Sequence, residues 1–560
     1  MLVGIDVGGT YTDGVLFSDG TVVYSAKHST DENDLEGTLL SVLDDLLNQA
    51  GSKRIKRIVL GTTLVTNLLA TGRTERAALL LLPGSGLPFS AYEGISPDTY
   101  FLKGSIDFRG REIEELDTEE IERVLQEIDR AGIRRIAVAG KFSNRNNRHE
   151  TAVQEMIRSR YPSMEVCTSN AISGHLNFPR RAVTCYYTAA TLKEWNRFAD
   201  GIAAAISVRL PGCELHILKA DGGTTTLEAS RKRPCETVFS GPAASTMGAL
   251  ALCRAPVNSV VVDIGGTTSD ISLLIGGQPL YASRGAQIDG HLTHIRSFAV
   301  SSTALGGDSP VLDESGKVRV GERRLGVAAC FGGEVPTVTD AFNVLMSLNI
   351  GNMEASRAKL QAVADRLGQP LEELCRAVAD RVIGILKARI EYMFSLWENE
   401  PAYKVWEVVN RRKFLLHQVV GVGAASPAIV PALARELGVD YFLHRYSAVA
   451  NALGAAVARP TLGVEVHVDT QERTCTISPG GMTRRVDDRN CQMEDVRQLA
   501  TLFLHDIGRE RGLSEYTDEA QVYLEEQFNV IRGSRLVGKV FDVGVQITPG
   551  FIHGYEGVAE

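Results

Sequence analysis

The chain has 560 residues, of which 44% are hydrophobic and 23% charged, and its formal net charge is −9 at pH 7. A chain of this length and composition buries substantial cores, and its length suggests about three or four domains. The acidic balance argues against a dominant nucleic-acid or anionic-membrane surface, and no apolar run reaches the ~18 residues that a membrane-spanning helix needs.

The chain begins with a motif between two apolar runs. The motif is Asp6-Val7-Gly8-Gly9-Thr10-Tyr11-Thr12-Asp13, and the runs on either side predict a strand, a tight turn and a returning strand. Paired glycines let backbone N–H groups approach phosphate oxygens, and threonine hydroxyls add donors. The predicted phosphate-binding residues are Gly8, Gly9, Thr10 and Thr12. An aspartate at a strand end can hold Mg²⁺ through water, so Asp6 is the predicted metal ligand.

The following elements are typical of one half of an actin-like ATPase. Residues 21–26 favour a strand, 34–50 a helix, 55–60 a strand and 64–70 a second helix. Three strands, a helix, a strand and a helix are the order of a ribonuclease-H-like unit, which actin-like and sugar-kinase-like ATPases contain twice. Residues 85–210 then predict a mixed α/β insertion, with helices at 118–131 and 148–160 around a strand at 135–139.

A second copy of the motif lies about half a chain further on. A strand at 214–219 and a small-residue helix at 240–251 precede Asp263-Ile264-Gly265-Gly266-Thr267-Thr268-Ser269-Asp270. One such segment is readily explained as an ordinary β-turn. Two copies between apolar strands favour paired hairpins that clamp a nucleoside triphosphate. The residues predicted to contact phosphate in this copy are Gly265, Gly266, Thr267 and Thr268, and Asp263 is the second predicted Mg²⁺ ligand.

The two motifs end on matching aspartates. Asp13 and Asp270 close the hairpins, and each either orients water or metal or makes a local hydrogen bond. With the two leading aspartates they complete a predicted catalytic set of Asp6, Asp13, Asp263 and Asp270.

The third part of the chain predicts an adenine site. A helix at 339–348 and one or two helices at 371–399 precede an apolar strand at 419–422. A Gly/Ala turn then gives an adenine ring a flat backbone surface, because no side chains intrude. The predicted adenine-side residues are Gly421, Gly423 and Ala424. A helix at 428–437 and a small-residue helix at 451–456 follow.

Composition shifts after Pro460 and predicts a separate unit. Two strand-like runs, a helix at 493–511 and strands at 521–528 and 535–547 suggest a small α/β domain. The predicted fold class is therefore α/β. Residues 1–180 form one ribonuclease-H-like half with the insertion, 181–460 the second half, and 461–560 the small C-terminal domain.

Three other residues could ligate a metal. Asp289, His291 and His294 leave open an additional metal site, since carboxylate and imidazole are good zinc or manganese ligands. Two histidines three residues apart without a certain helix do not decide the matter. His175 is interpreted as a surface or packed histidine, and Cys330 as a buried, inert thiol.

Taken together, the motifs resemble the hydantoinase A/oxoprolinase family of the acetate-kinase, sugar-kinase, Hsp70 and actin superfamily. The resemblance covers residues 1–460 and rests on both hairpins and on the segments 61–67, 221–223, 240–244, 336–341 and 421–427. It implies that the chain uses ATP and Mg²⁺ to open a cyclic amide such as a hydantoin, 5-oxoproline or a lactam. ATP would phosphorylate the carbonyl oxygen, because an unactivated amide is a poor electrophile. Relatives often need a second, hydantoinase B-like subunit, and some are the ATP-using subunits of carboxylases.

Two other functions stay open on the sequence. An ATP-dependent kinase of a small metabolite would leave a stable phosphorylated product, and an Hsp70- or actin-like ATPase switch would turn over ATP without small-molecule chemistry. Nine cysteines without a Cys-x-x-Cys pair, and an aspartate that interrupts any signal-peptide core, predict a cytoplasmic protein. We expect no nucleic-acid or membrane partner, and a homo-oligomer stays open.

Overall fold

The computed structural model describes residues 1–31, 33–51, 54–86, 88–92, 94–399, 413–486 and 491–558. Its first sheet has the strand order β12-β11-β4-β1-β2-β3. Strands β1, β2 and β3 form an antiparallel meander, whereas β4 is parallel to β1, and β11 is parallel to β4. The strands are β1 (Leu2–Val7), β2 (Tyr11–Ser18), β3 (Thr21–Ser29), β4 (Arg57–Thr62), β11 (Glu214–Leu218) and β12 (Thr224–Thr226).

The second sheet repeats this arrangement. Its order is β15-β14-β13-β21-β22, with β18 also paired to β14. Strand β14 is antiparallel to β13, while β21 is parallel to β13, and β22 is parallel to β21. The strands are β13 (Ser259–Ile264), β14 (Ser269–Ile275), β15 (Gln278–Pro279), β18 (Val300–Thr303), β21 (Gln418–Val422) and β22 (Asp440–Leu443). Each sheet thus contains one of the two Gly-Gly-Thr motifs at the turn between its first two strands.

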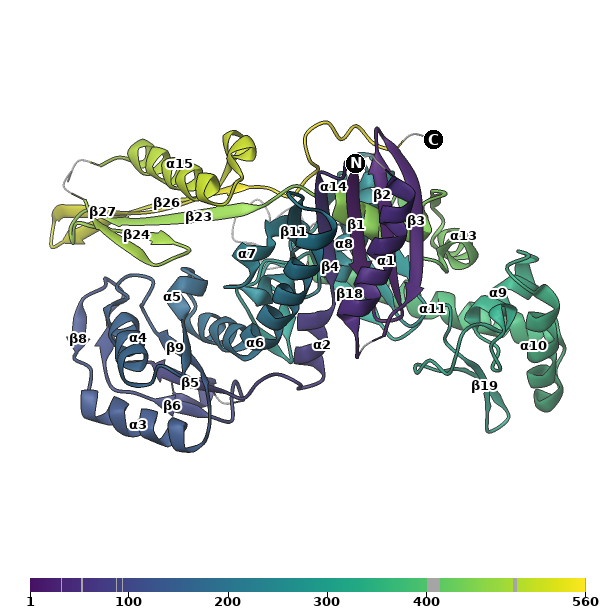
Figure 1. Cartoon of the computed structure of the whole chain (residues 1–560), viewed down its shortest axis with the longest axis horizontal. Coiled ribbons are helices and arrows are strands. Elements are labelled where there is room, and N and C mark those ends of the chain that lie inside the picture. The colour runs from purple at the N-terminus through teal and green to yellow at the C-terminus, as the bar shows by residue number, and fades with distance from the viewer. Residues whose placement is uncertain are drawn as a thin grey trace.

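Two small-residue helices lie between the sheets. These are α8 (Ser240–Leu252) and α14 (Ala450–Val457), which appear together near the centre of Figure 1. A Cβ on Gly248 would lie 2.2 Å from the Ala450 carbonyl oxygen, and a Cβ on Gly4 of β1 would lie 1.9 Å from that of Ala452. Small residues therefore allow the helices to approach each other and the first sheet closely.

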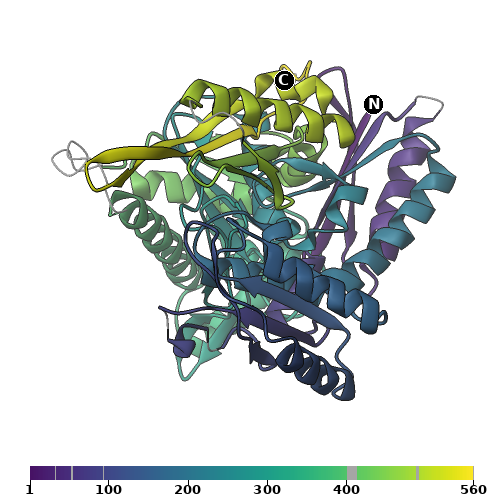
Figure 2. The same ribbon diagram turned by 90° about the vertical axis from the view of Figure 1, so that its left-hand side faces the viewer.

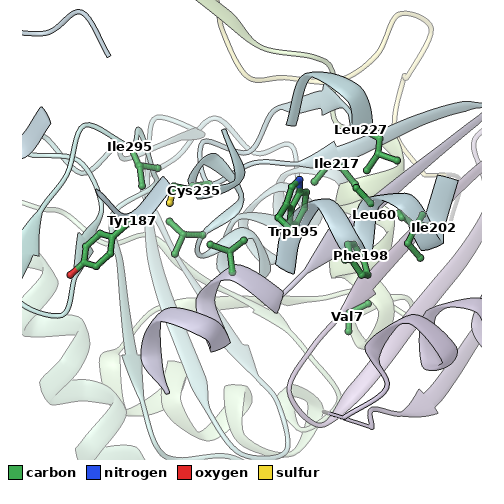
Figure 3. Close-up of a cluster of buried hydrophobic side chains, with 14 of the residues drawn as sticks. Val7, Leu60, Tyr187, Trp195, Phe198, Ile202, Ile217, Leu227, Cys235 and Ile295 are labelled. Atoms are coloured by element: carbon green, nitrogen blue, oxygen red, sulfur yellow. The ribbon is translucent and has the colours of Figure 1, made fainter. Parts of the chain in front are cut away.

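The outer faces of both sheets are covered by larger helices. On the first sheet, α1 (Leu35–Ala50) and α6 (Phe178–Arg209) share one core with the strands, and α2 (Leu64–Ala70) lies beside α6. Figure 3 shows Trp195 and Phe198 of α6 among the buried side chains of this core. On the second sheet, buried side chains of the covering helices join the strands in one core. The helices are α9 (Val338–Met346), α10 (Met353–Leu367), α11 (Leu371–Glu398) and α13 (Ser426–Leu437).

The insertion has its own parallel sheet, in the order β10-β9-β5-β6. It begins at residue 77, earlier than the predicted 85, because the apolar run at that point is strand β5 rather than part of the first half. Its elements are β5 (Ala77–Leu82), β6 (Thr99–Phe101), β9 (Arg135–Gly140), β10 (Glu165–Thr168), α3 (Thr118–Arg130), α4 (Arg148–Arg160) and α5 (Ser169–Ile172).

The C-terminal sheet has the order β25-β24-β23-β27-β26 and is covered by one helix. Figures 1 and 2 show this layer lying across the insertion. Its elements are β23 (Leu462–Asp469), β24 (Thr474–Ser478), β25 (Met482–Arg485), α15 (Met493–Glu510), β26 (Gln521–Arg532) and β27 (Arg535–Ile547). After β27 the chain returns to the first sheet, where Tyr555 packs on Phe17 at 5.8 Å between ring centroids.

Three short ladders and the one-turn helix α7 (Leu227–Ser230) lie outside these units. The ladders are β7 (Ser105–Ile106) with β8 (Glu112–Glu114), β16 (Gln287–Ile288) with β17 (His291–Leu292), and β19 (Val311–Glu314) with β20 (Lys317–Val320). Within the described ranges, no helix is both long and apolar enough to traverse a bilayer. The division of the chain at residue 180 stays a prediction. The sheets favour a later boundary, since α6 spans residue 180 and β11 still belongs to the first sheet.

Candidate phosphate-binding site

The two Gly-Gly-Thr turns face each other. The hydroxyl oxygens of Thr10 and Thr267 lie 3.2 Å apart, although the residues come from different sheets. Each turn is closed by an equivalent backbone bond, from Gly8 N to Tyr11 O at 3.1 Å and from Gly265 N to Thr268 O at 3.0 Å. The sequence repeat is therefore also a repeat of geometry, and both copies meet at one place.

A cavity of about 500 Å³ opens at this meeting point. Most of the residues predicted from the sequence line it. They are Asp6, Gly8, Gly9, Thr10, Asp13, Asp263, Gly265, Gly266, Thr267, Thr268, Asp270, Gly423 and Ala424. Backbone N–H groups, hydroxyls and carboxylates in a cleft of this size suit a phosphorylated ligand with its counter-ion.

Two predicted residues lie outside the cavity lining. Thr12 is fully buried and pairs with Thr30, at 3.0 Å between their hydroxyl oxygens. Gly421 lies inside β21, where an added Cβ would be 2.6 Å from Leu443 Cδ2, so its glycine serves packing. The wall beside Gly423 is instead built from small and apolar residues, namely Ala424, Ala425, Ala428, Ala448, Phe331 and Ile350.

Strand register brings four carboxyl groups to the cavity. Asp6 lies directly opposite Asp13 across β1 and β2, and Asp263 lies opposite Asp270 across β13 and β14. Burial raises the pKa of Asp6 to about 8, and the charges of Asp13 and Asp263 add to the shift. Burial, with the charge of Asp263, also raises the pKa of Asp270 to about 7. The pKa values of the other two carboxyls are raised, mainly by burial. The pocket therefore brings together carboxyl groups whose charged forms are disfavoured, and a bound cation would favour those forms.

Asp6 is the carboxyl group best placed to hold a cation. Its Oδ1 is buried and has no hydrogen-bond partner, and Gly61 leaves that oxygen room because a Cβ there would lie 2.3 Å away. Across the described ranges, no three His, Cys, Asp or Glu side chains converge as a complete metal-binding group. A Mg²⁺ ion that is shared with phosphates and water needs only one or two carboxylates, so Asp6 and Asp263 fit that kind of site.

Several cavity residues were not predicted as ligands. Lys27 donates to Asp13 at 2.5 Å, and its ammonium lies 5.0 Å from the Tyr11 ring centroid. Asp263 accepts hydrogen bonds from Ser245 and, at 3.2 Å, from Asn451 Nδ2. Asp13 pairs with Lys27 across β2 and β3. Aligning these two predicted strands in the sequence could have identified Lys27 as a neighbour of Asp13. Asn451 stands out as the polar residue that opens a helix of small side chains.

The two histidines of the possible additional metal site contact different partners. His291 Nε2 lies 3.1 Å from the Gly94 carbonyl oxygen, whereas His294 Nδ1 lies 2.9 Å from Ser173 Oγ. Neither they nor Asp289 belong to a metal-binding group in the described structure. Burial raises the pKa of Cys330 to about 11, as expected for an inert thiol.

Comparisons with known proteins agree with this architecture. The Hydantoinase/oxoprolinase profile matches residues 181–463, and the profile of the Hydantoinase/oxoprolinase N-terminal region matches residues 2–161. Caprolactamase subunit alpha of Pseudomonas jessenii is 24% identical over 98% of this chain and 80% of its own length. The acetophenone carboxylase gamma subunit of Aromatoleum aromaticum is 26% identical over 66% of this chain and 57% of its own. The 5-oxoprolinase of Saccharomyces cerevisiae is 23% identical over 81% of this chain but 41% of its own.

Two solved structures share the fold along nearly the whole chain. The ATP-dependent caprolactamase from Pseudomonas jessenii superposes with a TM-score of 0.69 at 20% identity, covering 97% of this chain and 87% of that one. Nucleotide-free acetone carboxylase gives a TM-score of 0.68 at 18% identity, with the same coverage. With two family profiles covering most of its length, the chain belongs to the hydantoinase/oxoprolinase family.

Proposed function

We propose that this chain binds Mg-ATP and uses it to open a cyclic amide, such as a hydantoin, 5-oxoproline or a lactam. The observation that carries the proposal is the pair of facing turns, with the Thr10 and Thr267 hydroxyl oxygens 3.2 Å apart above four clustered carboxyls. The two sheets, with their matching strand orders, would be ribonuclease-H-like halves of an actin-like ATPase. Caprolactamase and 5-oxoprolinase among the relatives support the substrate class.

The phosphates would lie between the turns. The backbone N–H groups of Gly9 and Gly266 would approach phosphate oxygens, because those of Gly8 and Gly265 already close the turns. Asp6 and Asp263 would hold Mg²⁺ directly or through water, and the ion would supply charge neutralisation for the phosphates. Lys27 already faces this cavity and can shift from Asp13 toward a phosphate when one is present.

The chemistry follows from the weakness of an amide as an electrophile. Transfer of the γ-phosphoryl group to the amide oxygen breaks the bond to the ADP oxygen and makes an imidate with a good leaving group. Water then adds to the carbon, the ring C–N bond breaks and the freed amine leaves an acyl phosphate. A second water releases phosphate from it, which gives an amino acid, ADP and phosphate. The protein contributes alignment and charge stabilisation at the transferred group, so Asp270 beside the phosphate turn is suited to positioning the amide N–H.

An acceptor site lies next to the phosphate cavity. A second cavity of about 870 Å³ shares Pro242 with it and is lined by Ser302. Ser302 donates a hydrogen bond to Asp270, so the two cavities are joined by a carboxylate and a hydroxyl. Tyr281, Phe298 and Leu292 give this second cavity apolar walls of the kind that a lactam ring would fit.

A second function is favoured by one group of relatives. The acetophenone carboxylase gamma subunit resembles this chain over 66% of its length, so the same ATP site could activate a carboxylation substrate. Relatives named as subunits also support a partner chain, which we propose to be hydantoinase B-like. In either case the chain studied alone would bind Mg-ATP.

The test is phosphate release from Mg-ATP by the purified chain with hydantoin, 5-oxoproline and caprolactam, and with product analysis by mass spectrometry. We expect amide-stimulated phosphate release and a ring-opened product, and loss of both in Asp6→Asn and Asp263→Asn. Asp19→Asn in the β2–β3 turn is the matched control, since it removes an exposed carboxyl outside the cavity. A stable phosphorylated metabolite would establish a kinase instead. ATP turnover that ignores every amide, even with a partner subunit added, would favour an ATPase switch.

A further inference from the structure

A separate polar cavity lies at the junction of the insertion and the C-terminal sheet. It has two lobes of about 180 and 220 Å³, which share Gly174, His175, Glu465 and Ser478. Gly174 comes from the loop after α5 and Ser478 from the end of β24. A Cβ at Gly174 would lie 2.0 Å from Ser478 Oγ, so the two parts touch at this wall. No residue of the phosphate cavity lines either lobe.

The charged groups of the lobe of about 180 Å³ are mostly paired. His175 Nδ1 lies 3.0 Å from Glu465 Oε1, and Lys219 lies 3.4 Å from Asp221. Arg233 pairs with a neighbouring glutamate at 3.5 Å. Arg296 differs, because no carboxylate among the residues that the structure describes lies within ion-pair distance of it. Its guanidinium lies instead 4.3 Å from the Tyr281 ring centroid. The lobe therefore has one cation available to an anion.

The cavity also contains acceptors that lack donors. Gln546, which lines the lobe with Arg296, is 7% exposed, and its Oε1 accepts no hydrogen bond. Asn170, which lines the other lobe, is 4% exposed and has an unpartnered Oδ1. A buried polar atom without a partner is unfavourable, so each of these acceptors favours a ligand that donates to it. Glu465, which accepts from Tyr523 at 2.6 Å and faces His175, adds negative charge to the same space.

We propose that this junction cavity is a second small-molecule site, which takes a compact amino carboxylate with its carboxylate on Arg296 and its ammonium toward Glu465 and Gln546. A cavity of about 150 Å³ holds benzene, so a lobe slightly larger than that takes a ligand of about seven to nine non-hydrogen atoms. The unpaired cation and the unpartnered Gln546 Oε1 on one lobe match the two ends of such a zwitterion.

Amino carboxylates are also the products of cyclic-amide opening, and identifying the ligand as such a product rests on the proposed function. The existence of the cavity as a binding site does not depend on that function. Its walls come from the loop after α5, helix α6, the turn after β11, residues 233–236 and 294–296, and strands β23, β24, β26 and β27. A ligand that contacts all of them would tie the insertion to the C-terminal sheet, and so would give the product a way to bias the position of the insertion.

The test is isothermal titration of the full chain with 6-aminohexanoate, compared with hexanoate and hexylamine, which each carry one of its two charges. We expect the zwitterion to bind at least about tenfold more tightly than either control compound. Arg296→Met should weaken its binding at least about tenfold and Arg296→Lys less, because lysine keeps the charge but loses the fork geometry. Arg158→Met, on the exposed face of α4, is the matched control and should bind as the wild type does.

The outcomes separate this inference from the proposed function. Thermal unfolding of each variant first establishes that it is folded. If the zwitterion does not bind the wild-type chain, or binds Arg296→Met equally well, the inference is wrong, whatever the chain does with ATP. If it binds as expected while no cyclic amide is opened, the site stands and the proposed function fails.

Discussion

Binding of Mg-ATP should release protons from the buried carboxyls of the phosphate cavity. A carboxyl with a pKa of about 8, as for Asp6, is about nine-tenths protonated at pH 7. One with a pKa of about 7, as for Asp270, is about half protonated at that pH. A cation placed beside these groups favours their charged forms. We therefore expect about one proton or more to leave the protein for each Mg-ATP bound at pH 7.

The perturbation is Asp6→Asn, which removes the carboxyl with the larger shift. Titration calorimetry in buffers of different ionisation enthalpy measures the number of protons, since the observed heat changes in proportion to it. The variant should release about 0.9 proton fewer at pH 7, whereas Asp19→Asn should match the wild type. Release should vanish as the pH rises above about 8. Equal proton release by Asp6→Asn and the wild type would refute the assignment of a raised pKa to Asp6.

The raised pKa of Asp6 also predicts how the free energy of unfolding changes with pH when no nucleotide is bound. The pKa of Asp6 rises from 3.8 to about 8 on folding, so between these values the folded state holds a proton that the unfolded state lacks. This contribution is complete below about pH 4 and is lost as the pH rises through about 8. The free energy of unfolding should thus fall with rising pH, by at most about 1.4 kcal/mol per pH unit from this group. Urea denaturation of Asp6→Asn should show a flatter profile than that of the wild type.

Four further substitutions test separate parts of the structure. Gly423→Ala places a Cβ 2.4 Å from Asp263 Oδ1 at a φ of 86°, so ATP turnover should fall at least about tenfold, and normal turnover would contradict the close approach. Asp340→Asn replaces a fully buried acceptor of three backbone N–H groups, so urea denaturation should give a free energy of unfolding lower by about 2–4 kcal/mol. A change below about 0.5 kcal/mol would contradict that role. Thr10→Val and Thr267→Val should couple by about 0.5–1.5 kcal/mol in ATP affinity, and strictly additive effects would mean that their hydroxyls do not interact.

The paired turns were predictable because their signal is local. A Gly-Gly-Thr segment between apolar strands specifies its own hairpin, and the repeat specifies a second one. Thr12 lies outside the cavity lining because side chains alternate along a strand. Its neighbours Tyr11 and Asp13 line the cavity, so Thr12 must face the opposite side, where it meets Thr30. The alternation was present in the sequence and would have excluded this residue.

The other misses depend on contacts between distant segments. Ser245 and Asn451 reach Asp263 from two helices that the sequence identifies only as rich in small residues. Strand β11 joins the first sheet after an insertion of more than a hundred residues, and no local pattern specifies which sheet a short apolar strand joins. Helix α10 was not predicted, and residues 371–399, predicted as one or two helices, contain the single helix α11.

The register of the two sheets explains why this site destabilises the folded state when no ligand is bound. Like charges directly opposite each other on antiparallel strands are unfavourable, yet Asp6 faces Asp13 and Asp263 faces Asp270 at equivalent positions of the two sheets. Local folding would be easier with one of each pair replaced, because neither pair is needed to form its hairpin. The fold tolerates them by binding protons and by the Lys27 contact, both of which a bound cation and phosphates can displace. The unfavourable carboxyl pairs therefore lie where the two sheets meet. A ligand that neutralises their charge favours the state in which the turns are held together.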